Sequence, residues 1–264
     1  KRGQKLVSVN AHWNYRVPTY FLYEVCEAVP NVVSEAQKTA IEKAKAASLA
    51  KRTCTKCGWV EELSRNYRSK WYIRGGLCPA CWEEMRIVTD RNEADEWARE
   101  ILKRDDVLIL DTETTDLDGE IIELAIINLR GETIYNSRFN PIEPVSAGAQ
   151  AVHGISTEML ANEPRFADCA LKILATLSTA GLVLIYNKVF DMGRLRYTCK
   201  LHGQLMPSIN ADCIMEQYAQ FVGDWSDYHE SYKWQPLGGG DHSALGDCKA
   251  ALATLREMAA HHEE

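Results

Sequence analysis

The pattern of apolar and polar residues divides the chain near residue 105. Before that point, an Ala-rich stretch without Pro or Gly begins with a Ser-x-x-Gln pair at Ser34, which predicts a capped helix near residues 34–52. A later charged stretch predicts a connecting helix over residues 83–104. Residues 1–33 mix aromatic and β-branched residues without a clear period, and their pattern indicates no role.

After Asp106 the pattern changes to short apolar runs that alternate with amphipathic stretches. The apolar runs predict strands at residues 107–110, 121–129, 133–139 and 182–185. The amphipathic stretches predict helices at about 166–178, at about 188–202, after Asp212 and at about 243–260. An α/β domain with helices flanking one mixed sheet is therefore expected.

Composition narrows the class of protein. With 46% hydrophobic and 25% charged residues, and no apolar run near the ~20 residues of a membrane-spanning helix, no membrane association is expected. Two Cys-x-x-Cys pairs and five scattered cysteines suit a reducing compartment, so a cytoplasmic location is expected.

The net charge of −7 conceals an opposite sign in the two parts of the chain. Residues 1–90 carry 15 Lys and Arg against 9 Asp and Glu, whereas residues 91–264 carry 15 against 28. Acidic residues crowded into the second part fit a site that needs cations, and basic residues in the first part fit a surface that contacts phosphates. Simple solubility explains the same composition.

Three short segments carry candidate carboxylates. Asp111 and Glu113 close the first predicted strand and stand two residues apart, so their side chains share one face. Asn187 and Asp191 follow the strand at 182–185 and stand four apart, on one helical face. Taken alone, each pair is equally well explained as a cap or a solvated carboxylate.

The third segment, His242-Ser243-Ala244-Leu245-Gly246-Asp247, opens the last predicted helix. It follows three glycines at 238–240, which indicate a loop that can move. A lone His is more often structural than catalytic, and a lone Asp in a helix is usually solvated, so this segment also proves little by itself.

The three segments together resemble the motifs of the DnaQ-like exonuclease superfamily, of the DEDDh kind. In that family an Asp-x-Glu, an Asn-x-x-Phe-Asp and a His-x-Ala-x-x-Asp follow one another, as do Asp111-Thr112-Glu113, Asn187 to Asp191, and His242 to Asp247 here. Val152-His153-Gly154-Ile155-Ser156 is similar to a further family segment. The resemblance covers about residues 105–260 and implies a ribonuclease H-like mixed sheet flanked by helices.

The resemblance also implies roles for individual residues. The catalytic set would be Asp111, Glu113, Asp191, His242 and Asp247. Four carboxylates in one cleft need hard divalent cations, here two Mg²⁺ or Mn²⁺ that hold a phosphodiester and activate water, and His242 would be the general base. The reaction would release nucleoside 5′-monophosphates from a 3′ end.

Four further residues in the motifs are expected to contact the substrate: Thr112, Thr114, Asn187 and Phe190. Phe190 is also expected to turn towards the core. His153 fits two roles about equally: it can shape the edge of the site, or it can be a packed structural residue. No catalytic role is expected for it.

The two cysteine pairs predict a second metal site. Cys54 and Cys57 are separated from Cys78 and Cys81 by 20 residues, close to the spacing of tetrahedral zinc sites, so one structural Zn²⁺ in a zinc-ribbon-like module is expected. Two redox-active dithiols are the less favoured alternative, because neither pair stands at a strand-to-helix junction.

Basic and aromatic residues alternate between the two cysteine pairs. Arg68 and Trp71 are candidates for neutralising phosphates and stacking bases. A small aromatic core with solvated basic residues, or a protein-docking surface, fits the same residues.

The sequence thus predicts four parts: residues 1–50 of unknown role, a zinc-ribbon-like module at 51–85, a connecting helix at 86–104, and an exonuclease domain at 105–264. The expected activity is 3′-to-5′ exonuclease action, with DNA favoured over RNA. The alternatives are an exoribonuclease of the same family and a zinc-containing adaptor that binds nucleic acid without cutting it. A protein partner would bind through the N-terminal segment or the zinc module.

Overall fold

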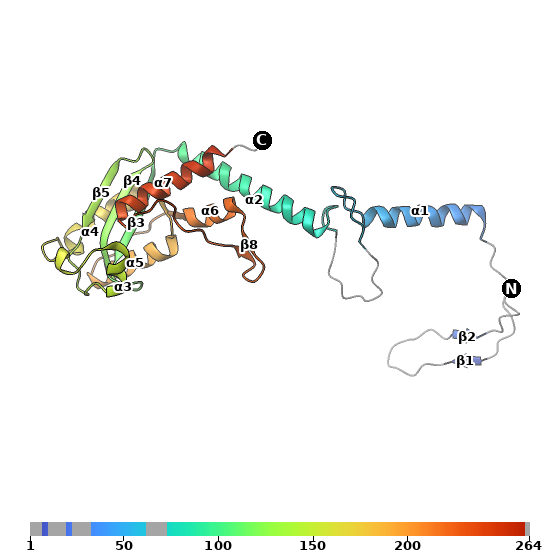
Figure 1. Cartoon of the computed structure of the whole chain (residues 1–264), viewed down its shortest axis with the longest axis horizontal. Helices are drawn as coiled ribbons and strands as arrows, with labels where there is room; N and C mark the ends of the chain where they lie inside the picture. The colour runs from blue at the N-terminus through green and yellow to red at the C-terminus, as the bar shows by residue number, and fades with distance from the viewer. Residues whose placement is uncertain (1–6, 10–19, 23–32, 62–72, 262–264) are drawn as a thin grey trace. The chain divides into compact units, whose positions relative to one another are not determined.

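The computed structural model of the chain describes residues 7–9, 20–22, 33–61 and 73–261, which fall into two compact units, Lys1–Trp82 and Glu83–Glu264 (Figure 1). In the first unit, β1 (Val7–Val9) pairs antiparallel with β2 (Tyr20–Leu22). Among the described residues, no helix has both the length and the apolar character needed to cross a bilayer.

Helix α1 (Glu35–Lys51) begins where the sequence predicts. The Ser34 hydroxyl accepts a hydrogen bond from the Gln37 backbone N–H at 3.3 Å, and the Gln37 side chain accepts one from the Ser34 N–H at 2.9 Å. This reciprocal pair is a capping box and satisfies two N–H groups that the helix itself cannot satisfy. No side chain of α1 is buried, so packing against a core does not stabilise this helix.

Helix α2 (Pro79–Leu102) begins earlier than the predicted connecting helix, and it includes Cys81 in its first turn. Pro79 stands at the first helical position, where its missing N–H costs no hydrogen bond. Further along, the Arg91 guanidinium donates to the carbonyls of Phe221 and Val222 and thereby satisfies the end of another helix, α6 (Ile214–Val222).

Within residues 83–261, one five-stranded mixed sheet has the order β5-β4-β3-β6-β7. Its strands are β3 (Val107–Thr114), β4 (Ile121–Asn128), β5 (Thr133–Arg138), β6 (Leu182–Ile185) and β7 (Ala211–Cys213). β3 pairs antiparallel with β4 and parallel with β6. The predicted strands are confirmed. The three-residue β7 is too short to leave a sequence pattern.

Helices α4 (Phe166–Thr179), α5 (Lys188–Leu201), α6 and α7 (Ala244–Ala260) also confirm the predicted positions. The sequence did not predict α3 (Ala147–His153), the 3₁₀ turn η2 (Glu158–Leu160), or the short hairpin of β8 (Trp225–Ser226) and β9 (Ser231–Tyr232).

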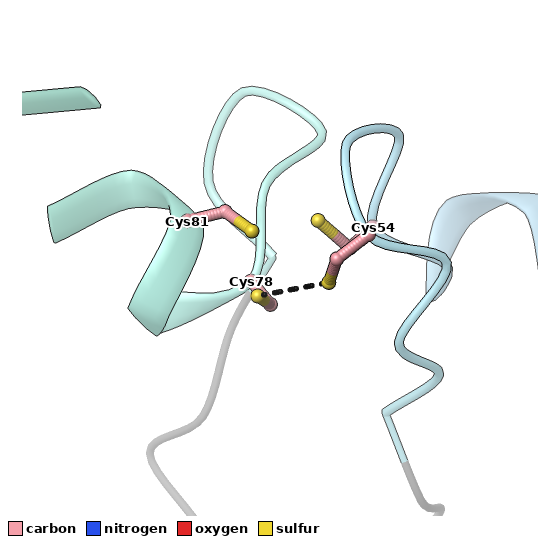
Figure 2. A group of neighbouring side chains, drawn as sticks. Cys54, Cys78 and Cys81 are labelled. Atoms are coloured by element: carbon pink, nitrogen blue, oxygen red, sulfur yellow. Dashed lines mark hydrogen bonds between the residues drawn. The ribbon is translucent and has the colours of Figure 1, made fainter. Parts of the chain in front are cut away.

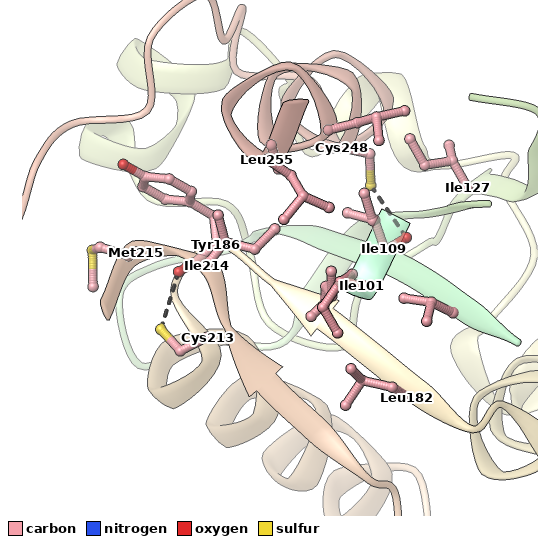
Figure 3. Packing of buried hydrophobic residues seen from close by; sticks show 14 of the residues in the cluster. Ile101, Ile109, Ile127, Leu182, Tyr186, Cys213, Ile214, Met215, Cys248 and Leu255 are labelled. Carbon is pink, nitrogen blue, oxygen red and sulfur yellow. Dashed lines mark hydrogen bonds between the residues drawn. The ribbon is translucent and has the colours of Figure 1, made fainter. Parts of the chain in front are cut away.

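Side chains that alternate along β3 enter two different cores. Val107 and Ile109 pack with α7, α6 and the end of α2, and Figure 3 shows Ile109 facing Cys248 of α7. Leu110 packs on the opposite face, against α4 and α5. The sheet is therefore the middle of three layers, and the odd-numbered residues of β3 face α7.

Candidate active site

The odd-numbered face of β3 continues from its apolar residues into carboxylates. Asp111 and Glu113 follow Ile109 on that face, and Asp247 lies in the first turn of α7, which packs against it. The carboxylates of Asp111, Glu113 and Asp247 offer oxygen atoms that all lie within 4.8 Å of one another. Two of the three sequence motifs thus meet at one point.

Asp191 approaches this point from the opposite face of the sheet. It is buried in the first turn of α5, and its Oδ1 accepts a hydrogen bond from the Thr112 hydroxyl at 2.7 Å. Thr112 is even-numbered, so it faces α5 rather than α7. Asp191 therefore lies outside the group of three, but its negative charge contributes more than that of any other neighbour to the raised pKa of Asp111.

Burial raises the pKa of every carboxylate in this set and is the largest cause at each position. Neighbouring negative charges add to it at Asp111 and Glu113, whereas hydrogen bonds oppose it at Asp191 and Asp247. The pKa of Glu113 rises to about 8 and that of Asp191 to about 7, while those of Asp111 and Asp247 are also raised. The four acids cannot all ionise without a compensating cation, and oxygen ligands suit Mg²⁺ and Mn²⁺.

These raised pKa values predict that a divalent cation stabilises the protein more as pH rises. Without metal, the protonated Glu113 favours the folded state, a contribution complete below its ordinary pKa of 4.5 and lost as pH rises through about 8. A cation competes with those protons. The rise in Tm on adding Mn²⁺ to the zinc-loaded protein should be small at about pH 5 and large at about pH 8.

Calorimetric melts with and without Mn²⁺ at both pH values measure this difference. Asp111→Asn is the control, because it removes one ligand and one of the repelling charges and should flatten the dependence on pH. An equal gain in Tm at both pH values in the wild type would contradict the assignment of the cation to these carboxylates.

His242 stands in the loop that leads into α7, with an exposed side chain. Its φ of 57° is left-handed, a conformation that non-glycine residues seldom adopt. Asp247 supports this loop, because its Oδ1 accepts from the backbone N–H groups of Asp241 at 3.0 Å and His242 at 3.3 Å. Asp247 thus belongs to the group of three carboxylates and also holds the backbone of the loop that carries the His242 imidazole.

Gly240 makes this arrangement sterically feasible. A Cβ atom at Gly240 would lie 2.6 Å from Asp247 Oδ1, closer than real Cβ contacts come. A Cβ atom at Gly238, two residues earlier, would meet no atom within 4 Å. Of these two glycines, only Gly240 is required by a close approach.

His153 is held by the backbone on both sides of its ring. Nε2 donates to the Thr114 carbonyl at 3.1 Å, and Nδ1 accepts from the Ile155 N–H at 3.1 Å, so one neutral tautomer satisfies both bonds. Burial, the largest cause, lowers the pKa of His153. This geometry fits the packed structural role that sequence analysis left open.

The residues expected to contact substrate are partly engaged already. Asn187 caps α5, where its Oδ1 accepts from the Phe190 N–H at 3.3 Å. The Thr114 hydroxyl donates to the Asp116 carbonyl at 2.7 Å. Phe190 is half-buried and belongs to neither main core. Arg68 and Trp71 lie outside the residues that the structure describes.

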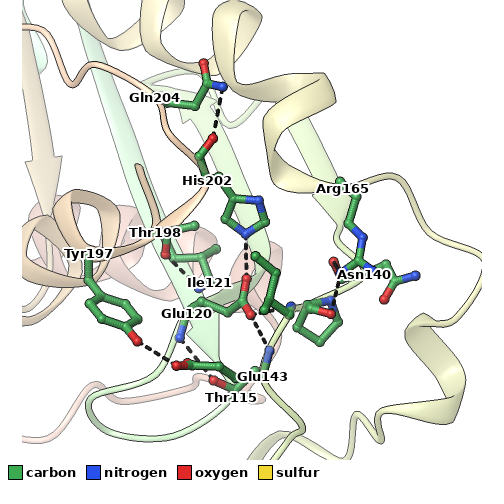
Figure 4. A network of polar contacts seen from close by, with 12 residues as sticks. Thr115, Glu120, Ile121, Asn140, Glu143, Arg165, Tyr197, Thr198, His202 and Gln204 are labelled. Atoms are coloured by element: carbon green, nitrogen blue, oxygen red, sulfur yellow. Dashed lines mark hydrogen bonds and ion pairs between the residues drawn. The ribbon is translucent and has the colours of Figure 1, made fainter. Parts of the chain in front are cut away.

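A second polar network fixes the loop that follows Glu113 (Figure 4). Thr115 and Glu120 close the loop through two hydrogen bonds of 2.9 and 3.0 Å. The buried Glu120 carboxylate also accepts from His202 Nε2 at 2.6 Å and from the Glu143 N–H at 2.7 Å. The strand end that carries the candidate ligands is therefore tied to α5 and to the segment after β5.

One carboxylate at the site lies outside the three sequence motifs. Glu123 lies in β4 directly opposite Glu113, and its charge contributes to the raised pKa values of Glu113 and Asp111. A sequence signal was present, since Glu123 is the one charged residue in the run Ile-Ile-Glu-Leu-Ala-Ile-Ile. A charged residue is seldom fully buried unless it is paired.

The cysteine pairs form a separate cluster in the first unit. The sulfur atoms of Cys54, Cys57, Cys78 and Cys81 lie within 4.8 Å of one another. In Figure 2, Cys54 stands on one loop, and Cys78 and Cys81 face it from the other side of the cluster. Four converging sulfurs fit a tetrahedral zinc site.

Backbone hydrogen bonds prepare the cluster for a cation. Those from the N–H groups of Cys57 and Cys78 are the largest causes that lower the pKa of Cys54, to about 6. Burial and the neighbouring cysteines raise the pKa of Cys81 to about 12. A metal ion that binds thiolates would remove the proton that Cys81 otherwise keeps.

Comparison with known proteins finds a matching family model, curated relatives and similar solved structures. The model of the exonuclease family RNase_T matches residues 108–255. An uncharacterized exonuclease of Escherichia phage 186 is 31% identical over 174 residues, which cover 59% of this chain and 89% of that protein. The DNA polymerase III subunit epsilon of Pasteurella multocida is 34% identical over 119 residues, 40% of this chain, and the match spans only 46% of that subunit.

Among solved structures, exonuclease X in complex with 5′ overhanging duplex DNA is 23% identical, with a TM-score of 0.41, over 59% of this chain and 94% of that one. Exonuclease I of E. coli in complex with a dA16 oligonucleotide is 17% identical, with a TM-score of 0.48, over 57% of this chain and 40% of that one.

Proposed function

Because the chain belongs to the exonuclease family whose model matches residues 108–255, we propose that it is a metal-dependent 3′-to-5′ exonuclease that acts on DNA. The observation that carries this proposal is the meeting of Asp111, Glu113 and Asp247 within 4.8 Å, with Asp191 adding its charge. DNA is favoured over RNA because several relatives are DNA polymerase III subunits by name.

The four carboxylates are proposed to hold the divalent cations, since all their ligand atoms are oxygens and none of the four has a neutralising Lys or Arg among the described ion pairs. When bound, two such ions would stabilise the negative charge that develops on the phosphodiester as water attacks it. His242 is proposed to accept the proton of that water, because its exposed imidazole follows the loop that Asp247 supports.

Contacts to the substrate are proposed for the motif residues that remain available. Thr112 and Thr114 donate their hydroxyls within the protein, so they would approach the terminal nucleotide through their backbone. Asn187 keeps its amide NH₂ for a substrate atom after its Oδ1 has capped α5. The half-buried ring of Phe190 offers a face on which a base can stack.

Direct digestion tests the proposed function. Oligonucleotides labelled at the 5′ end or at the 3′ end, as single-stranded DNA, duplex DNA and RNA, are incubated with the zinc-loaded chain and Mn²⁺. A ladder from 5′-labelled DNA, immediate release of the 3′ label as a mononucleotide, and no reaction in EDTA are expected. Preferential shortening of RNA would favour an exoribonuclease, and binding without shortening would favour an adaptor.

Gly240→Ala is expected to lower kcat by about tenfold to about a hundredfold, because an added Cβ would push the Asp247 carboxylate out of place. Gly238→Ala is the matched control, since its Cβ would meet no atom within 4 Å, and it should leave kcat within about twofold. Single-turnover rates with saturating Mn²⁺ measure both. Equal rates for the two variants would argue against the placement of Asp247.

We further propose that Cys54, Cys57, Cys78 and Cys81 hold one structural Zn²⁺. Apart from the cysteines themselves, the described core of this cluster contains only the partly buried Ile73 and Leu77. So small a core cannot fold without a cross-link or a metal.

Chelating zinc, or Cys54→Ser, is expected to unfold residues 50–85 and spare the sheet. Hydrogen exchange should show loss of protection at the N–H groups of Cys54 and Thr55, which donate to Trp59 and Gly76, and unchanged protection in β3 and β4. Cys169→Ser, in α4, is the control and should leave the cluster protected. Unchanged protection at Cys54 after zinc removal would sink the proposal.

A further inference from the structure

Glu123 is a buried carboxylate beside the candidate site that neither the sequence motifs nor the proposed reaction uses. It is 6% exposed and stands in β4 directly opposite Glu113 of β3. Its Oε1 accepts from Arg138 Nε at 2.8 Å, and its Oε2 accepts from the Ala244 backbone N–H at 2.9 Å. One carboxylate thus joins two neighbouring strands to the start of α7.

The hydrogen bond to Ala244 holds the N-terminal end of α7, next to His242 and Asp247. Ala244 is the first residue of α7, where N–H groups have no partner within the helix. His242 lies two residues before it and Asp247 three residues after it. Ser243, the N-cap, satisfies the Gly246 N–H at 3.1 Å but makes no bond to the sheet through that hydroxyl. Glu123 supplies a hydrogen bond between the first residue of the helix and the sheet.

A contribution to the stability of the folded protein does not explain why a carboxylate stands at position 123. Glu123 is buried next to Glu113 and Asp111, whose charges repel its own. A buried ion pair can often be replaced by apolar residues of similar volume with little loss or even a gain in stability. A carboxylate kept among like charges is better explained by the position it imposes, since its two oxygens fix two donors at once.

We propose that Glu123, supported by Arg138, is a positioning residue for the exonuclease reaction. By holding the Ala244 N–H against β4, it sets where His242 and Asp247 stand relative to the carboxylates of β3. This inference rests on the proposed function, because it assigns Glu123 to the same site.

Glu123→Gln tests the inference with nearly unchanged shape. A Gln side chain has one carbonyl oxygen and one NH₂ group, so it cannot accept from both Arg138 and Ala244. Because the end of α7 would shift, kcat on single-stranded DNA should fall by about tenfold to about a hundredfold, with KM within about twofold. Arg138→Met alone, which leaves the bond to Ala244, should lower kcat less.

The double variant Glu123→Gln/Arg138→Met provides the rescue. Without the guanidinium, the Gln oxygen can turn to the Ala244 N–H, and kcat should recover part of the loss caused by Glu123→Gln. A recovery of kcat would not be expected if Glu123 had a merely structural role, because removing both charged groups of the ion pair with Arg138 does not restore packing. A double variant no faster than Glu123→Gln would overturn the inference.

Asp95→Asn is the matched control at the other end of α7. Asp95 is 3% exposed, pairs with Arg99 at 2.7 Å, and lies 3.7 Å from His261 Nδ1, the residue that ends α7. Its substitution should lower Tm but leave kcat per folded molecule unchanged. If Asp95→Asn lowered kcat as much as Glu123→Gln, or if Glu123→Gln lowered Tm alone, Glu123 would be only a structural anchor.

Mn²⁺ titration calorimetry on the same zinc-loaded proteins separates this inference from the proposed function. If the wild type binds Mn²⁺ but cuts no nucleic acid, the proposed function fails, while weaker Mn²⁺ binding by Glu123→Gln still supports the positioning of Asp247. Unchanged Mn²⁺ affinity together with unchanged kcat overturns the inference in an active enzyme. A wild type that neither cuts nor binds Mn²⁺ overturns both.

Discussion

Asp111→Asn is expected to lower kcat on a single-stranded oligodeoxynucleotide by about a thousandfold. Asp111 offers an oxygen to the same cation position as Glu113 and Asp247, and all of these charges act on its pKa. Metal stabilisation of the transition state is worth several kcal/mol, and about 1.4 kcal/mol corresponds to a factor of ten in rate. Single-turnover rates at saturating Mn²⁺ measure the loss.

Unfolding cannot account for such a loss. Asparagine has nearly the same shape, and it removes a buried charge that its neighbours repel, so Tm without metal should stay the same or rise. Asp118→Asn, in the exposed loop between β3 and β4, is the control and should keep wild-type kcat. An Asp111→Asn variant within tenfold of wild-type kcat would show that this carboxylate does not hold a required cation.

His242→Asn is expected to lower kcat by about a hundredfold to about ten-thousandfold, the usual contribution of a general base. Asparagine suits the left-handed φ of 57° better than alanine does, so this variant removes the imidazole with little added backbone strain. No carboxylate is lost, and Mn²⁺ affinity and KM should stay close to the wild type.

Chemical rescue distinguishes a role of His242 as general base from a purely structural role. In His242→Gly, which also tolerates the left-handed backbone, added imidazole should restore part of the rate. His229→Asn, in the exposed tip between β8 and β9, is the control for loss of an imidazole and should keep wild-type kcat. A His242→Asn variant that kept more than about a tenth of wild-type kcat would remove His242 as the base.

The main elements could be predicted from the sequence because their patterns are local. Alternation in β3 placed Asp111 and Glu113 on one face, and the Ser34 capping box marked the start of α1. The parts that escaped prediction are short or depend on distant partners. Three residues of β7 do not show a period, and the hairpin of β8 and β9 is held from outside by Arg86, which stacks on Trp225 at 3.9 Å.

The candidate site was predictable as a set of residues but not as an arrangement. Sequence motifs named the carboxylates, yet they could not show that Thr112, 79 residues away, holds Asp191 on the far side of the sheet. The hydrogen bond from the Ala244 N–H to Glu123 joins residues 121 positions apart. Its only trace in the sequence is one charged residue within an otherwise apolar strand. Such contacts arise from packing of the sheet against its helices, and no local pattern encodes them.

A crystal of the full chain soaked in Mn²⁺ tests the central claim most directly, because anomalous scattering locates the ion independently of activity. We predict a Mn²⁺ peak bound by oxygens of Asp111, Glu113 and Asp247, with Asp191 beside it. Ordered motifs with no Mn²⁺ among these carboxylates, or with Asp247 turned away from β3, would contradict it.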